Sequence, residues 1–159
     1  MGASEELQHA ALLRDLGAME RVPVGTRMHV EEDGFIYIGV GTIASDIARW
    51  IEWTHANVWM PEHALQRIQL QHTTLLDPIA VASFILMNPM SIHHDSRAHN
   101  YVYLIVGAGV LRDQGLVQSR RALYVDAVVE LRHVNGGVLP RLFHLSPRDQ
   151  NMGGSRLWP

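Results

Sequence analysis

The sequence predicts an α+β fold in which N-terminal helices pack on one face of a twisted C-terminal antiparallel β-sheet. Apolar residues recur at helical spacing in several runs as far as Asn88-Pro89, and from residue 91 onward they alternate as in strands. The dipeptide Asn135-Gly136 is typical of a tight hairpin turn. With 47% hydrophobic residues in a chain of 159, we expect one domain over residues 1–147 and a flexible C-terminal tail over 148–159.

The first part of the chain predicts two helices separated by a pair of short strands. Ser4 is a suitable N-cap for a helix over residues 4–17, in which leucines follow at helical spacing. The run "RMHVEEDGFIYIGV" indicates two strands around the turn dipeptide Asp33-Gly34. Ser45 or Asp46 then caps a helix whose apolar face carries Ile47, Trp50, Ile51 and Thr54.

Two further helices are predicted before the strands begin. Pro61 is suited to the first position of a helix that extends to about His72. Asp77-Pro78 starts the next helix, "DPIAVASFILM", which ends at Asn88-Pro89. This helix is apolar nearly all round, so we expect it to be buried.

The C-terminal half predicts a central strand followed by a hairpin. The run "YVYLIVG" at 101–107 is apolar on both faces, as in a central strand. In "ALYVDAVVELRHV" the odd positions are apolar, which predicts one core face and one open face; they are Leu123, Val125, Ala127, Val129 and Leu131. A two-residue turn at Asn135-Gly136 would place Glu130 opposite Arg141, whereas a three-residue turn would shift that register.

Composition excludes several function classes. The formal charge of −3 does not favour tight non-specific binding to nucleic acid, although a local basic patch stays open. The chain has no cysteine, which excludes disulfides, thiolate zinc sites and a cysteine nucleophile. No stretch resembles a secretory signal or a membrane span, so a cytoplasmic protein is expected.

The predicted hairpin gathers charged side chains on one face. That face would carry Tyr124, Asp126, Glu130, Arg132 and Arg141, while Val138, Leu142 and His144 would join the apolar face. A carboxylate among arginines can serve RNA cleavage by 2′-hydroxyl attack, which needs a base, phosphate-binding cations and an acid. The alternative is an exposed cross-strand ion pair, worth about 0.2–1 kcal/mol and without a catalytic role.

The run "HALQRIQLQHTTLLDPIAVASFILMNPMSIHHD", followed by "YVYLIVG", "RRALYVDAVVELRHV" and "VLPRLFHLSP", resembles the barnase, EndoU, colicin and RelE-like nucleases, especially their phage-associated branch. The resemblance covers about residues 62–147. It matches His72 to a helix histidine, Asn88-Pro89 to the helix end, Asp95 to an acidic strand end and Phe143 to an aromatic of the last strand. Arg141 stands where the family has threonine, and Pro140 is a second departure from the pattern.

The resemblance implies an RNA-cleaving or RNA-binding, toxin-like domain that needs no cofactor. In this hypothesis Glu130 is the general base, Arg132 and Arg141 bind phosphate, and His72 or His94 is the acid. Expected partners are RNA and an immunity or antitoxin protein, without a membrane. The alternative is a non-catalytic binding or oligomerisation domain, for which a homo-oligomer is one form.

A metal-dependent enzyme is the third hypothesis. His93, Asp95 and His144 resemble the two-histidine, one-carboxylate triad of Fe(II) and 2-oxoglutarate dioxygenases, with Arg156 about where a co-substrate arginine would lie. His94, Asp95 and His99 offer a simpler set of ligands for zinc or nickel.

Overall fold

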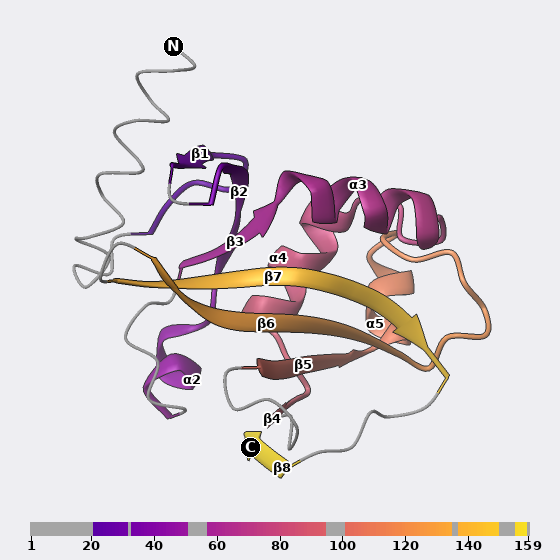
Figure 1. Cartoon of the computed structure of the whole chain (residues 1–159). Coiled ribbons are helices and arrows are strands. Elements are labelled where there is room, and N and C mark those ends of the chain that lie inside the picture. Colours follow the sequence, from indigo (N-terminus) through magenta and orange to yellow (C-terminus); the bar gives the residue numbers. More distant parts are fainter. Residues whose placement is uncertain are drawn as a thin grey trace.

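The computed structural model describes residues 21–31, 33–50, 57–94, 101–134, 137–149 and 155–158. These residues form one eight-stranded sheet in the order β1-β2-β3-β7-β6-β5-β4-β8 (Figure 1). Its strands are β1 (Arg27–Val30), β2 (Phe35–Thr42), β3 (Asn57–Pro61), β4 (Ser91–His94), β5 (Tyr101–Gly107), β6 (Tyr124–Val134), β7 (Gly137–Arg148) and β8 (Ser155–Trp158). Neighbours pair antiparallel except β3 and β7, which run parallel, so the sheet is mixed.

The described helices lie between strands along the chain, and the predicted fold class is therefore wrong. They are α2 (Ser45–Trp50), α3 (Glu62–Gln71), α4 (Pro78–Met87) and α5 (Ala108–Asp113), so the sheet begins before any of them. Sequence reasoning missed β3, "NVWMP", because all five of its residues are buried and give no alternating pattern. The helix predicted over 4–17 lies outside the described residues.

Two predicted helices are confirmed. Pro61, expected at the first helical position, is the N-cap of α3, which begins one residue later at Glu62. Asp77 is the N-cap of α4, where its side chain accepts a hydrogen bond from the Ala80 backbone N–H. The helix α4 ends at Met87, directly before Asn88-Pro89. The expectation that α4 is buried all round is wrong, because its buried residues recur at helical spacing on one face; they are Pro78, Val81, Ala82, Ile85 and Leu86.

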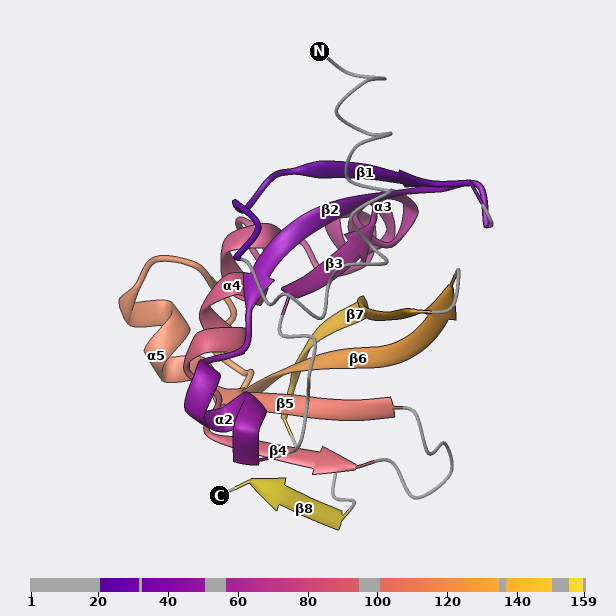
Figure 2. The same ribbon diagram turned by 90° about the vertical axis from the view of Figure 1, so that its left-hand side faces the viewer.

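The main hydrophobic core lies between the helices and one face of the sheet. Residues of all four described helices pack there against Val102, Leu104, Val125, Ala127 and Leu142. Figure 2 shows α2, α4 and α5 to one side of β5 and β6. The opposite face, here called the second face, carries a row of paired residues, Trp59, Arg141, Glu130 and Tyr101. Tyr37 is on the same face, two residues from Gly39, which pairs with Trp59.

The second face is less open than predicted. Met28, Val30, Tyr37, Trp59 and Leu139 form a small second core near β1, β2 and β3. Further along, Tyr103, Ile105, Asp126 and Val128 are also buried. The side chains left partly open on this face lie on β5, β6 and β7, and α3 packs against β7.

The C-terminal residues extend the sheet. Residues 155–158, which fall within the predicted tail, form β8 and pair antiparallel with β4. The strand β7 ends at Arg148, so the hairpin strand continues one residue beyond the predicted end of the domain at 147.

Candidate functional site

Helix α3 lies along β7 and covers part of its edge. In the described residues β3 pairs with β7 only through Trp59 and Arg141, and α3 then packs beside the continuing strand (Figure 1). The Arg67 guanidinium donates a hydrogen bond of 2.8 Å to the backbone carbonyl of Phe143, which anchors the helix to the strand. We call this region the α3–β7 seam; its residues are Arg67, His72, Arg141, Phe143, His144 and Arg148.

A β-bulge at Phe143 decides which side chains enter the seam. Val128 pairs with His144 but Val129 pairs with Leu142, which leaves Phe143 without a residue opposite it. Beyond the bulge Leu145, instead of His144, faces the core. The prediction that His144 joins the apolar face is therefore wrong, because the predicted register holds only as far as Leu142.

The bulge brings His144 next to His72 at the C-terminal end of α3. Their ring centroids are 5.8 Å apart, in an edge-to-face arrangement. Burial lowers the pKa of His72 below its ordinary value of 6.5, and Arg148 lowers it further. Burial also lowers the pKa of His144, and positive charge at His72, Arg148 and Arg67 adds to this effect. Two imidazoles with lowered pKa values can share the work of a general base and a general acid.

The predicted pairing of Glu130 with Arg141 is confirmed. The two residues are opposite each other in the β6–β7 ladder, and Arg141 Nη2 donates to Glu130 Oε2 at 3.0 Å. Each side chain is only 14% exposed. The Glu130 carboxylate is thus held in a largely buried ion pair, which favours a structural role for it over that of a free general base.

Arg132 belongs to a second ion pair close to the first. Its Nε lies 3.9 Å from Asp33 Oδ2, and Asp33 also accepts a hydrogen bond from the Tyr37 hydroxyl. Burial raises the pKa of Tyr37 and its hydrogen bond to Asp33 adds to this, so the phenol stays protonated as a donor. These contacts tie the β1–β2 turn to β6.

Asp126 is a fully buried carboxyl group beneath the histidine end of the seam. Its Oδ2 lies 2.5 Å from Arg148 Nε, although the two groups are not aligned for a hydrogen bond. Burial raises the pKa of Asp126 to about 6, and the Arg148 charge opposes but does not cancel this effect. Asp126 therefore retains a proton in the folded state at pH values where it is ionised in the unfolded chain.

This difference predicts that Asp126 makes stability depend on pH. Because the folded pKa is above the unfolded one, stabilisation is complete below about pH 4 and is lost as pH rises through about 6. A shift of this size corresponds to about 3 kcal/mol. The free energy of unfolding is measured in urea from pH 4 to 7 for the wild type and for Asp126→Asn. Over this range the wild type should lose about 3 kcal/mol more than the variant. Parallel pH profiles would contradict the assignment.

The remaining predicted site residues do not join the seam. His94 pairs with Val102 on the helix side of the sheet, away from Glu130. His93 is on the second face, three strands from His144, which corresponds to roughly 14 Å at normal strand spacing. One metal ion cannot bind both. Asp95 and His99 lie outside the described residues, within which there is no cluster of three metal-ligating side chains.

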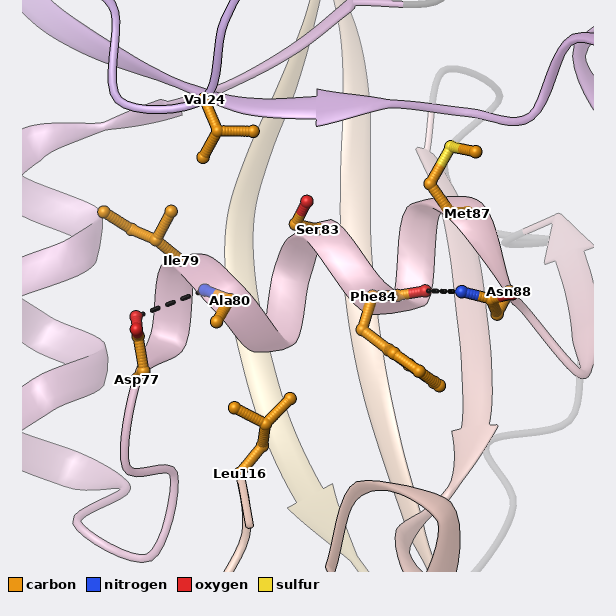
Figure 3. A pocket seen from close by; sticks show the side chains of 9 residues that line it. All are labelled: Val24, Asp77, Ile79, Ala80, Ser83, Phe84, Met87, Asn88 and Leu116. Carbon is orange, nitrogen blue, oxygen red and sulfur yellow. Dashed lines mark hydrogen bonds between the residues drawn. The ribbon is translucent and has the colours of Figure 1, made fainter. Parts of the chain in front are cut away.

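A separate hollow of about 520 Å³ lies over α4 (Figure 3). It is mainly apolar, and its lining includes Val24, Ile79, Ser83, Phe84, Met87 and Leu116. Val24 and Met87 are exposed in the isolated chain. Ile79 also lines a neighbouring hollow of about 450 Å³ beside α3. Sequence reasoning missed both hollows, since α4 was expected to be buried all round.

Comparison with known proteins gives no relative from which a role could be transferred. No family model matches the chain, and no curated protein or solved structure matches it either. Among the described helices, none is long and apolar enough to cross a membrane. The resemblance to the barnase, EndoU, colicin and RelE-like nucleases therefore stays a prediction.

Proposed function

We propose that the protein binds RNA along the α3–β7 seam and cleaves it without a metal ion, using His72 and His144 as the acid–base pair. The observation that carries this proposal is the contact between these two imidazoles beside Arg67 and Arg148. A toxin of this kind would act in the cytoplasm and would need an immunity or antitoxin protein as its partner.

The chemistry follows from the protonation states of the pair. One neutral imidazole accepts the proton of a ribose 2′-hydroxyl, whose oxygen attacks the adjacent phosphorus. The other imidazole, protonated, donates its proton to the departing 5′-oxygen. The products are a 2′,3′-cyclic phosphate and a 5′-hydroxyl end. The guanidinium groups of Arg67 and Arg148 offset the charge on the non-bridging phosphate oxygens.

This proposal changes the roles that the sequence suggested for the hairpin. His72 keeps its role, and His144 replaces Glu130 as the second proton-transfer group. Arg141 and Glu130 would then hold β6 and β7 in register beside the site, because their charges already satisfy each other.

RNA cleavage in the presence of a chelator tests the proposal. We expect kcat/KM to follow a bell-shaped pH profile with its optimum below pH 6.5, because the pKa values of both histidines are lowered from 6.5. The cut RNA should end in a cyclic phosphate, and DNA of the same sequence should stay intact because it has no 2′-hydroxyl. Cleavage that requires a divalent metal ion, or that also cuts DNA, would refute the mechanism.

A non-catalytic binding domain is the second candidate function. The apolar hollow over α4 favours it, because exposed Val24 and Met87 could pack against an apolar side chain of a partner protein or of a second copy. The same assay separates the two candidates. Intact RNA at every pH would favour the binding domain.

A further inference from the structure

We propose that the seam takes single-stranded RNA, one base of which stacks on the rings of Tyr101 and Phe143 beside the two histidines. This inference rests on the proposed function and names the form of its substrate. The ring centroids of Tyr101 and Phe143 are 5.2 Å apart, with their planes tilted by 55°. Both residues are half-buried, so part of this aromatic surface is open.

The aromatic pair lies on the second face next to a cation. Tyr101 pairs with Glu130, which in turn pairs with Arg141, so the three residues form one row across β5, β6 and β7. The Arg141 guanidinium carbon lies 5.9 Å from the centre of the Phe143 ring. A planar guanidinium and two rings form a surface of the kind on which unpaired bases stack.

The bulge sets the base site beside the proposed reaction site. In a regular strand Phe143 and His144 would point to opposite faces, because successive side chains alternate. Here Phe143 contacts Tyr101 and His144 pairs with Val128, so both lie toward the second face. A nucleotide carries a base and a phosphate on one sugar. Adjacent residues can therefore contact both, with the aromatic ring of Phe143 on the base and the imidazole of His144 at the phosphate.

Arg67 links the two sites further. Its guanidinium donates to the Phe143 carbonyl and lowers the pKa of His144 through its charge, so it lies near both residues. A phosphate next to the stacked base would therefore meet a cation as well as an imidazole. This arrangement needs an unpaired base, since bases within a duplex are stacked on their neighbours and are not free to stack on a ring.

Binding of uncleavable RNA tests the inference. A short 2′-O-methyl oligonucleotide, which cannot undergo 2′-hydroxyl attack, is titrated with the protein by fluorescence anisotropy. We expect the single strand to bind at least about 10-fold more tightly than the same sequence in a duplex. Phe143→Leu should weaken single-strand binding roughly 5- to 150-fold. Phe84→Leu, an aromatic substitution in the hollow over α4, is the matched control and should leave the Kd unchanged.

An abasic scan identifies the stacked base. Removing one base of the oligonucleotide should weaken binding to the wild type, and removing the same base should have no further effect on Phe143→Leu. If Phe143→Leu fails to fold, as judged by circular dichroism, Tyr101→Leu takes its place in the same comparison. Equal binding of duplex and single strand, or unchanged binding by a folded ring variant, would overturn the inference.

The outcomes separate this inference from the proposed catalysis. Single-strand binding that depends on Phe143, without cleavage of natural RNA, would support the base site and reject the histidine mechanism. Cleavage that proceeds equally well on duplex RNA would support the histidine mechanism and reject the base site. Absence of binding to any RNA would overturn both.

Discussion

We expect the His144→Ala variant to cleave RNA about 10²–10⁴-fold more slowly than the wild type, because the seam would lose one of its two proton-transfer groups. His72→Ala should show a loss of similar size. The double variant should be little slower than either single one, since the two histidines act as a unit. Initial rates in chelator, with folding verified by circular dichroism, provide the measurement.

His63→Ala is the matched control for this experiment. His63 is on α3, but it lies near the end of the helix opposite His72. There its ring centroid is 4.7 Å from that of Phe35. Its removal should leave the cleavage rate within a few-fold of the wild type. If His144→Ala stays active while Glu130→Gln is inactive and folded, the general base is Glu130, as the sequence alone suggested.

The sequence of the β6–β7 hairpin predicts the pairing of its residues only as far as Leu142. The Asn135-Gly136 turn correctly predicted the pairs from Val134 with Gly137 to Glu130 with Arg141. The error begins at Phe143, where the bulge adds one residue to β7. The sequence contains a signal for it: Leu142 and Leu145, both buried, are three positions apart, an odd spacing that a regular strand would place on opposite faces.

The N-terminal strands were harder to predict for a different reason. The run around Asp33-Gly34 correctly indicated β1 and β2, but local pattern does not show which distant strand they join. β3 carries the connection, since it pairs antiparallel with β2 and parallel with β7. A short strand buried on both faces resembles any other apolar segment, so its partners are set by tertiary packing.

We expect Arg141→Met to lower the free energy of unfolding by about 3–5 kcal/mol, because it leaves the Glu130 carboxylate largely buried without a counter-charge. Methionine retains much of the packing of the arginine's apolar stem, so the loss reports the missing charge rather than missing packing. The double variant Glu130→Gln with Arg141→Met should recover a large part of the stability, as no unpaired charge then remains. Urea denaturation at pH 7 measures each value.

Arg27→Met is the matched control, since it breaks an ion pair of similar length between much more exposed side chains. Arg27 lies 2.7 Å from Glu62, with the two side chains 53% and 35% exposed. Solvent screens that pair, so its loss should cost at most about 1 kcal/mol. If Arg141→Met costs no more than Arg27→Met, the Glu130–Arg141 pair does not stabilise the sheet. Its arginine would then be free to bind a ligand phosphate, as the sequence-based hypothesis had it.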